Sequence, residues 1–273
     1  MTGNTPIGIF DSGVGGLTVA RQVFQMLPQE AVVYFGDVGR YPYGGRSREI
    51  ITRFTIQDIT FLLEHHVKFI ICACNSASSV ALDQIKNNYD VEIIGVIEPG
   101  ARAAVEQTKN GRIGVIGTNA TIGSNAYARI IHDLDPQTKV FSLACPLFVP
   151  LAEEGYVDKE AANLIARDYL QTMHDVKIDT LVLGCTHYPL LRHVIADVMG
   201  DNVTLIDSGA ETAKVAQQQL AACDLLSPAG TDVEATGQHK FFVSDVPEKF
   251  SQVAGRFLGE VIEQITRVDI SGY

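Results

Sequence analysis

The chain has 273 residues, of which 46% are hydrophobic and 19% are charged, and its formal net charge at pH 7 is −11. This length exceeds the usual size of one domain, so two domains are expected. The negative charge argues against a nucleic-acid-binding groove and against an anionic membrane surface as partners, although a local pocket can still bind a small anionic substrate.

Five cysteines are an odd number in a chain of this size, which disfavours a disulfide framework and favours reduced thiols. Residues 1–6 carry neither the basic region nor the apolar region of a secretion signal. No uninterrupted apolar stretch approaches the roughly 20 residues needed to cross a bilayer. We therefore expect a globular, cytoplasmic protein that does not enter a membrane.

The first part of the chain alternates short apolar runs with amphipathic stretches, as parallel α/β sheets do. The predicted strands span residues 7–10, 31–35, 69–74 and 91–96, and the predicted helices span 17–27, 47–66, 76–88 and 100–108. Glu98, Pro99 and Gly100 interrupt the pattern, and we take them as the boundary between two domains.

The pattern then restarts, so residues 7–98 and 112–208 look like two copies of one βα arrangement. The predicted strands are 112–117, 139–143, 180–185 and 203–206, the predicted helices are 120–134, 158–173, 190–199 and one from 207, and 145–155 is predicted to be an irregular linker. The tail contains a predicted loop (225–231), strand (239–244) and helix (247–263), and this unit could extend either sheet.

Two stretches mirror each other in these copies. Residues 69–76 read Phe-Ile-Ile-Cys-Ala-Cys-Asn-Ser, and residues 180–189 read Thr-Leu-Val-Leu-Gly-Cys-Thr-His-Tyr-Pro. Each apolar run ends in a cysteine, Cys74 or Cys185, at the turn into a predicted helix. Because open α/β sheets bind ligands at the carboxyl ends of their strands, the two cysteines suggest two half-sites that face one ligand.

Two glycine-rich loops are further candidates for ligand binding. Residues 11–16 (Asp-Ser-Gly-Val-Gly-Gly) link a strand to a helix, and such a turn presents backbone N–H groups to an anion. The Walker lysine and the dinucleotide fingerprint are both missing, which favours a carboxylate ligand over a nucleotide. In the loop 36–46, Tyr43 could offer a hydroxyl and Gly44 a closely approaching backbone.

Together these motifs resemble the glutamate racemases, which belong to the cofactor-independent aspartate/glutamate racemases. The resemblance runs from residue 7 to about residue 210 and rests on the loop 11–16, residues 41–44, both cysteine motifs and the segment around Glu153. It implies an α/β fold of two pseudo-symmetric domains with mostly parallel central sheets flanked by helices, and an active site in the cleft between them. The first domain would comprise residues 1–98 and 209–273, and the second residues 99–208.

The resemblance also implies the activity, which is interconversion of L- and D-glutamate to supply D-glutamate for peptidoglycan, without a cofactor or metal and in a homodimer. Cys74 and Cys185 match the two catalytic thiols, and Asp11, Glu153 and His187 match residues that assist them. The positions that match substrate-binding residues are Asp11, Ser12, Tyr43, Gly44, Asn75, Ser76, Thr118, Thr121, Thr186 and His187. Ser76 stands where the family usually has threonine; because the hydroxyl is kept, we expect binding to survive with slightly looser packing.

The chemistry can also be argued from the residues. Inverting an α-carbon requires a base that removes a proton from one face and an acid that returns one to the other, and two facing cysteines have this geometry. The thiolate is the active base, and a helix N-terminus after each cysteine would favour it. Pro189 fits the first turn of the second helix. His187 could exchange a proton with Cys185, and Asp11 could accept one from Cys74.

Each of these residues also has a simpler interpretation. A lone cysteine after an apolar strand is more often a small core residue than a catalyst, and we expect Cys72, Cys145 and Cys223 to be structural. A lone histidine such as His187 is more often buried or capping. Glu153 stands beside another glutamate, and an acidic pair is usually a solvated face, so its assignment depends mainly on the resemblance.

Three other functions remain open. The substrate could be aspartate, or the protein another two-thiol racemase, because one methylene changes discrimination by only ~1–3 kcal/mol. A zinc site could use Cys72, Cys74, Cys185 and His187, although zinc ligand pairs normally have longer spacings. A non-catalytic protein that closes on a small anion is the third alternative.

Overall fold

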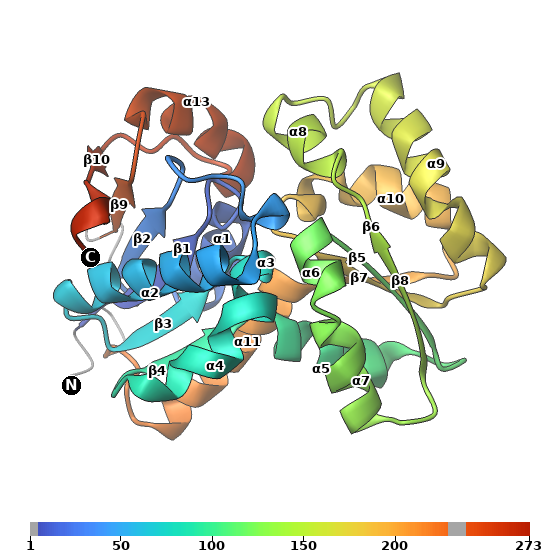
Figure 1. The fold of residues 1–273 in the computed structure, drawn as a ribbon, viewed down its shortest axis with the longest axis horizontal. Coiled ribbons are helices and arrows are strands. Elements are labelled where there is room, and N and C mark those ends of the chain that lie inside the picture. The colour runs from blue at the N-terminus through green and yellow to red at the C-terminus, as the bar shows by residue number, and fades with distance from the viewer. Residues whose placement is uncertain (1–4, 229–238) are drawn as a thin grey trace.

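The computed structural model describes residues 5–228 and 239–273, which form two parallel β-sheets with helices packed on their faces (Figure 1). The strands of the first sheet are β1 (Ile7–Asp11), β2 (Val32–Gly36), β3 (Phe69–Cys72), β4 (Glu92–Gly95), β9 (Lys240–Val243) and β10 (Ile265–Arg267). The second sheet contains β5 (Arg112–Gly117), β6 (Lys139–Ala144), β7 (Thr180–Gly184) and β8 (Thr204–Asp207). All neighbouring strands in both sheets run parallel, so the predicted fold class is confirmed.

The two sheets repeat one strand order. The first has the order β10-β9-β2-β1-β3-β4 and the second the order β6-β5-β7-β8, so β5 to β8 occupy the places of β1 to β4. This topology confirms the repeat that the sequence pattern indicated. The tail, whose sheet the sequence left open, extends the first sheet, because β9 pairs with β2 and β10 with β9.

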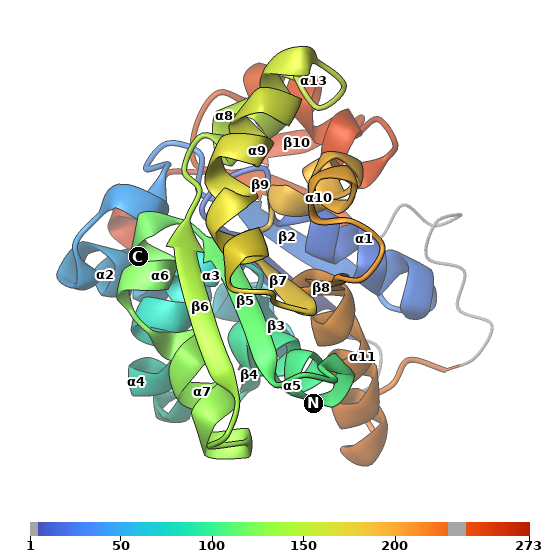
Figure 2. The same cartoon turned by 90° about the vertical axis from the view of Figure 1, so that its right-hand side faces the viewer.

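The helices form layers on both faces of each sheet (Figure 2). The helices of the first part are α1 (Leu17–Met26), α2 (Arg48–Glu64), α3 (Asn75–Ala77), α4 (Asp83–Ile85) and α13 (Pro247–Leu258). Those of the middle part are α5 (Ile97–Gln107), α6 (Asn119–Gly123), α7 (Ala126–Leu134), α8 (Phe148–Glu153), α9 (Glu160–Asp175), α10 (Arg192–Met199) and α11 (Ser208–Ala222). Short 3₁₀ turns cover Tyr43–Gly45, Lys86–Asn88, Tyr188–Leu191 and Ile270–Gly272.

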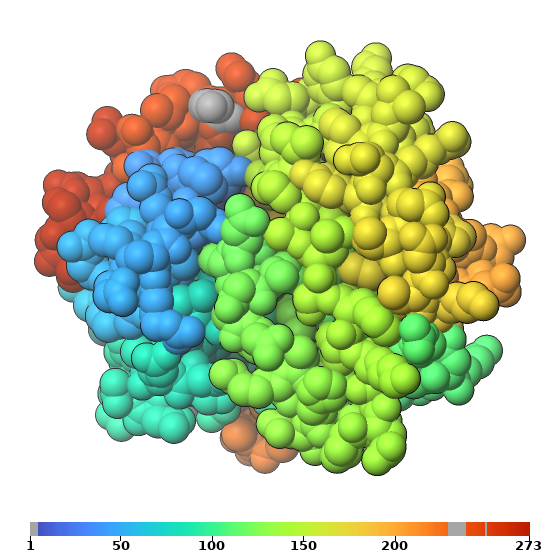
Figure 3. Space-filling model, turned by 45° about the vertical axis from the view of Figure 1, so that its right-hand side comes forward, coloured from blue at the N-terminus to red at the C-terminus, as the bar shows by residue number. Residues whose placement is uncertain are grey.

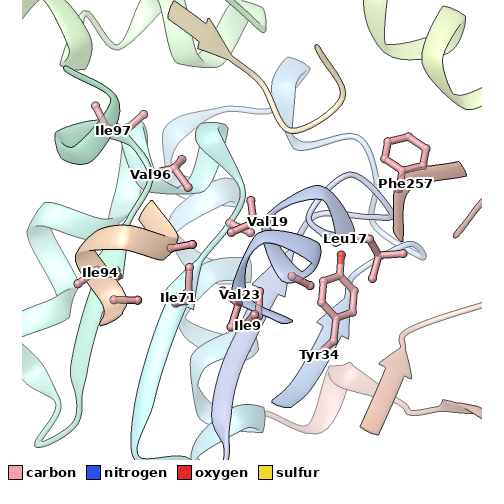
Figure 4. Packing of buried hydrophobic residues seen from close by; sticks show 14 of the residues in the cluster. Ile9, Leu17, Val19, Val23, Tyr34, Ile71, Ile94, Val96, Ile97 and Phe257 are labelled. Atoms are coloured by element: carbon pink, nitrogen blue, oxygen red, sulfur yellow. The ribbon is translucent and has the colours of Figure 1, made fainter. Parts of the chain in front are cut away.

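A single hydrophobic cluster joins the facing sides of the two sheets. Figure 4 shows the part of this cluster around β1 and α1. Along β1, Ile7 and Ile9 point into this cluster, whereas Phe10 points to the opposite face, as the period of two in a strand requires. Val115 and Val182 of the second sheet belong to the same cluster, together with side chains of α1, α5, α11 and α13. Two further clusters cover the outer faces, one beneath α2 and α4 and one beneath α9 and α10.

Several predicted elements differ from the structure. Pro99 and Gly100 do not separate two secondary-structure elements. They lie within α5, which begins at Ile97, because proline is tolerated in a first helical turn. The predicted helix 76–88 is divided into α3, a π-helical turn (Ser78–Leu82), α4 and a 3₁₀ turn. Asn125, with φ of 57°, separates α6 from α7 within the predicted helix 120–134. The domain limits at residues 98 and 208 remain a prediction.

Two segments contain elements that the sequence pattern did not indicate. The predicted linker 145–155 includes α8, whose few residues are too short to show helical periodicity. The predicted helix 247–263 ends at Leu258, where Gly259 adopts a left-handed conformation, and β10 follows. Of the predicted loop 225–231, residues 229–231 lie outside the described part. Among the helices that the structure describes, none has the length and apolar character needed to cross a membrane.

Candidate active site between the two sheets

Cys74 and Cys185 line one small cavity where the carboxyl ends of the two sheets face each other. Cys74 follows β3, which lies beside β1, and Cys185 follows β7 at the equivalent place in the second sheet. The cavity has a volume of about 40 Å3. Its walls are formed by Ser12, Tyr41, Pro42, Tyr43, Gly44, Cys74, Asn75, Ser76, Thr118, Val149, Cys185, Thr186 and His187. The space-filling view shows the N-terminal and central parts of the chain in close contact (Figure 3).

The thiol of Cys74 is buried among partners from the first sheet. Its Sγ lies 3.5 Å from Ser12 Oγ and accepts a hydrogen bond from the backbone N–H of Ala77 at 3.5 Å. Burial, together with the negative charge of Asp11, raises the pKa of Cys74 to about 12. We expected a helix N-terminus to lower the pKa of Cys74. Burial outweighs this effect, because α3 is a single turn.

Cys185 belongs to a chain of polar groups in the second sheet. Its Sγ lies 3.8 Å from Nδ1 of His187, and Nε2 of His187 lies 2.9 Å from Oε1 of Glu153. Burial lowers the pKa of His187, but the hydrogen bonds to Cys185 and Glu153 outweigh it and raise that pKa to about 10. The order thiol, imidazole, carboxylate is suited to moving a proton to and from Cys185.

Aromatic rings hold the imidazole of His187 in place. The ring of Tyr41 stacks on it with a centroid distance of 6.3 Å, and Phe257 of α13 meets it edge-on at 5.2 Å. Arg256, also of α13, donates a hydrogen bond to the backbone oxygen of Glu153. The C-terminal segment therefore supports this site, although neither Phe257 nor Arg256 was among the residues that the sequence predicted.

The loop 11–16 brings the two halves into contact. A Cβ on Gly15 would lie 2.3 Å from Thr186 Oγ1, so only glycine allows this approach. Thr18 of α1 donates to the backbone oxygen of Thr186 at 2.9 Å. Asp11, a predicted acid–base residue, does not line the cavity; its Oδ2 accepts from the backbone of Gly13, and burial raises its pKa.

Asn75 offers an unused hydrogen-bond donor beside the cavity. Its Oδ1 accepts from the hydroxyl of Tyr127 in the other half at 2.9 Å, while its Nδ2 is buried and has no partner within the described residues. A buried donor without a partner is costly, and a ligand oxygen would satisfy it. Tyr127 fixes this amide but was not predicted from the sequence, because no motif marks its position in the first turn of α7.

Hydroxyl groups from both halves meet at the junction, by which we mean the contact between the loops at the carboxyl ends of the two sheets. Ser76 Oγ lies 2.9 Å from Thr118 Oγ1, which lies 3.1 Å from Thr121 Oγ1. Ser76 and Thr118 line the cavity, whereas Thr121 is buried behind Thr118 and does not. A Cβ on Gly44 would lie 2.8 Å from Thr118 Cβ, so the loop of the first half contacts this wall closely.

The hydroxyl of Tyr43 does not face the cavity. It bonds Asp37 Oδ2 and lies 2.9 Å from Asp58 Oδ2, and neither of these aspartates lines the cavity. The expectation that this hydroxyl is offered to a ligand is therefore wrong, because buried carboxylates occupy it. Among the predicted positions, Ser12, Tyr43, Gly44, Asn75, Ser76, Thr118, Thr186 and His187 line the cavity.

The remaining cysteines lie outside the cavity wall. Cys72 and Cys145 are buried, as expected of structural thiols, but Cys223 is exposed, so a structural role for it is not supported. In residues 5–228 and 239–273, no group of three or more histidine, cysteine or acidic side chains is arranged to hold a metal ion.

Comparisons with known proteins agree with this geometry. The model of the Asp/Glu/hydantoin racemase family matches residues 19–216. The chain is 48% identical to a glutamate racemase of Geobacter metallireducens, over 97% of this chain and 96% of the relative. It is 46% identical to one of Chlorobaculum tepidum, over 98% and 97%.

A solved structure is similar over the whole fold. The glutamate racemase of Francisella tularensis, crystallised with D-glutamate, superimposes with a TM-score of 0.92 and is 39% identical, covering 99% of this chain and 100% of that one. From the family model and the identity over nearly the full length, the chain belongs to the Asp/Glu/hydantoin racemase family and, within it, to the glutamate racemases.

Proposed function

We propose that this racemase interconverts L- and D-glutamate by a two-thiol proton transfer in which Cys74 and Cys185 act on opposite faces of the α-carbon. The observation that carries this proposal is that the two thiols come from separate sheets and yet line the same cavity. One thiolate removes the α-proton and the other thiol returns a proton from the opposite side, so the configuration inverts without rotation of the substrate.

Neutral donors would hold the substrate carboxylates. Asn75 Nδ2 needs an acceptor, and the hydroxyls of Ser12, Ser76 and Thr118 stand along the wall. No lysine or arginine occurs among the residues that line the cavity, and the cationic group that can form there is the imidazolium of His187, whose pKa is raised to about 10. Oriented neutral dipoles in a site that excludes water can stabilise developing charge without prior reorganisation. We propose Asn75 and Thr118 as the principal carboxylate contacts.

Access of the substrate requires the walls to move. A volume of about 40 Å3 is far below the 300–1,000 Å3 of ordinary ligand pockets. The hydroxyl contact between Ser76 and Thr118 and the bond between Thr18 and Thr186 both cross the junction. Opening of the junction would admit glutamate, and closure would exclude water from the reaction.

The two thiols are set up differently for proton exchange. Cys185 has His187 and Glu153 behind it, so a proton can pass between the thiol and the imidazole. Cys74 has the hydroxyl of Ser12 as its side-chain hydrogen-bond partner, and Asp11 acts on it through its charge. We propose that Glu153 orients His187 and that Asp11 positions the loop carrying Ser12.

Single cysteine substitutions test the two-thiol assignment. We expect Cys74→Ala and Cys185→Ala each to reduce racemisation by roughly 10²–10⁴-fold or more, because each removes one of two obligatory acid–base groups. D-Glutamate should still bind to both variants in calorimetry. Cys223→Ala, which changes an exposed thiol, is the matched control and should keep full activity. Near-normal turnover in either of the first two variants would refute the mechanism.

Substrate preference is tested with each enantiomer of glutamate and of aspartate, without added cofactor, by circular dichroism. Exchange of the α-hydrogen in heavy water separates catalysis from binding alone: a non-catalytic anion-binding protein would show none. Equal or faster turnover of aspartate would favour the alternative of an aspartate racemase.

We further propose that the enzyme works in the cytoplasm and supplies D-glutamate for peptidoglycan. Its homodimeric state is likewise a proposal, which sedimentation equilibrium of the purified protein will test. A strain depleted of the enzyme should need external D-glutamate to grow and keep its shape.

A further inference from the structure

The loop that carries Tyr41 to Gly44 into the active site is anchored on a cluster of buried charges. We call Asp37, Arg40, Tyr43 and Asp58 the Asp58 cluster. Arg40 Nε lies 2.6 Å from Asp37 Oδ2, and Arg40 Nη2 lies 2.9 Å from Asp58 Oδ1. Both carboxylates are fully buried, and Asp58 reaches the loop from α2. The loop is therefore fastened to the first domain by one guanidinium and one phenol.

The phenol of Tyr43 poses a problem of hydrogen counting. Its oxygen is in hydrogen-bond contact with Asp37 Oδ2 and lies 2.9 Å from Asp58 Oδ2. A phenol has one hydrogen, whereas an ionised carboxylate can only accept. With both carboxylates ionised, one of the two contacts would be a buried approach of two oxygens with no hydrogen between them. Both contacts are favourable only if one carboxyl group carries a proton.

The other contacts of the cluster show where this proton resides. Asp37 Oδ2 is within hydrogen-bond distance of both Arg40 Nε and Tyr43, and a guanidinium N–H directed at this oxygen disfavours a proton on it. Asp58 accepts from Arg40 through Oδ1, which leaves Oδ2 free to donate to the phenol. One aspartate and one arginine then balance in charge, as a buried group requires.

We propose that Asp58 is a positioning residue of the racemase, held neutral so that its Oδ2–H donates to Tyr43 and fixes the loop 41–44 against the second domain. This inference rests on the proposed function only for its catalytic consequence. The titratable and charged groups that face Asp58 are Asp37, Arg40 and Tyr43 from the loop, with Asp11 of β1 and Cys72 of β3 farther off. Burial, and then the charge of Asp37, raises the pKa of Asp58 well above its usual value.

The cluster acts on the active site through short covalent and packing steps. Tyr43 is followed by Gly44, whose backbone packs on Thr118 across the junction, and Tyr41 in the same loop stacks on His187. Arg40 also lies over the ring of Phe54 at 4.1 Å and donates to Gln57 Oε1, both on α2. A loosened cluster would move two walls of the cavity without touching the thiols.

Asparagine is the matched replacement, because its Nδ2–H can stand in for the hydroxyl of a neutral carboxyl group. We expect Asp58→Asn to keep KM and kcat for glutamate within about twofold, whereas Asp58→Ala, which removes the donor, should raise KM about tenfold, as loss of ~1.4 kcal/mol would. Asp37→Asn removes the required charge and should raise KM at least as much as Asp58→Ala. The kcat should fall less than KM rises, because the thiols are unmoved.

A second measurement does not depend on racemase activity. A carboxyl group that binds its proton when folded and releases it when unfolded makes the protein less stable as pH rises from about 4 to its folded pKa. Relative to Asp58→Asn, the unfolding constant of the wild type should therefore rise about tenfold for each pH unit between pH 5 and pH 7. The infrared spectrum of the folded wild type should contain one carboxylic-acid carbonyl band that Asp58→Asn lacks.

The outcomes separate the cluster from the enzyme function. If Asp58→Asn is as damaged as Asp58→Ala, or does not fold, Asp58 is ionised and the proposal is wrong. If the unfolding constant depends on pH equally in the wild type and in Asp58→Asn, the proposal is also wrong. If the slope and the infrared band behave as expected but no variant changes KM, Asp58 is neutral without positioning the loop, and the positioning role is overturned.

Discussion

The two thiols that line the cavity have different neighbours, and the imidazole beside Cys185 makes the stability of the folded protein depend on pH. Cys74 has a hydroxyl partner and a pKa raised to about 12, whereas Cys185 faces an imidazole whose pKa is raised to about 10. A histidine whose pKa is higher in the folded protein than its unfolded value of about 6.5 adds stability that is complete below pH 6.5. That contribution is lost as pH rises through 10.

Glu153→Gln should narrow the pH range of activity. The substitution keeps the shape of the side chain but removes the charge that holds the proton on His187. A hydrogen bond between charged groups contributes ~1.5–3 kcal/mol, and Glu153 is partly exposed. The pH above which kcat/KM declines should therefore fall by about one unit. The pH profile, measured with both enantiomers, checks this. Glu154→Gln, at the exposed neighbour, should leave the profile unchanged; an unaltered profile in Glu153→Gln would exclude the relay.

Single residues were predicted unevenly from the sequence. Cys74, Cys185 and Asn75 could be found because each lies directly after a recognisable strand, and the position of the strand also places the residues next to it in sequence. Tyr127, Phe257 and Asp58 could not, because their contacts join segments far apart in sequence and no local pattern marks them. Tyr43 was placed at the cavity, but the direction of its hydroxyl depends on Asp37 and Asp58.

Glycines at two positions allow loops of the first half to approach the second half closely. Gly15 fits against Thr186 and Gly44 against Thr118, and a methyl group at either position would collide with the other half. The 3₁₀ turn Tyr43–Gly45 also contains Gly45, around which a Cβ would meet no atom within 4 Å. Adjacent glycines in one turn therefore differ in what they require.

Gly44→Ala and Gly45→Ala form a matched pair. In Gly44→Ala the new methyl would lie 2.8 Å from Thr118 Cβ, which forces the loop or the opposite wall to shift, and kcat/KM should fall roughly 10- to 100-fold. Gly45→Ala has room for its methyl and should stay within about twofold. Steady-state kinetics on both variants test this, and equal losses would show that chain stiffness, and not the contact with Thr118, is responsible.

Across the whole molecule, the two sheets share one hydrophobic core. Ile9 of β1 and Val115 of β5 belong to the same cluster, and α1, α5 and α11 are packed between the sheets. Hydrogen bonds of Tyr127 to Asn75 and of Thr18 to Thr186 cross the junction as well. Separate unfolding of one half would expose this cluster to water at a cost of ~25 cal/mol for each Å2 of apolar surface.

Thermal unfolding should therefore occur in a single transition. We expect one peak in calorimetry, with the same midpoint by near- and far-ultraviolet circular dichroism, because neither half can bury its inner face alone. Saturating D-glutamate should raise the midpoint without dividing the peak, since it binds only the folded state. Two resolved peaks would mean that the halves unfold independently.

By itself the sequence determined the parallel α/β architecture, its internal repeat and the two cysteines at the strand ends, because these depend on local periodicity and on residues adjacent in the chain. Only the tertiary structure decided which way Tyr43 and Asp37 point, that the tail joins the first sheet, and that Cys223 is exposed. Side-chain direction and partnership depend on what packs against a residue from elsewhere in the chain, and that information is absent from any local stretch of sequence.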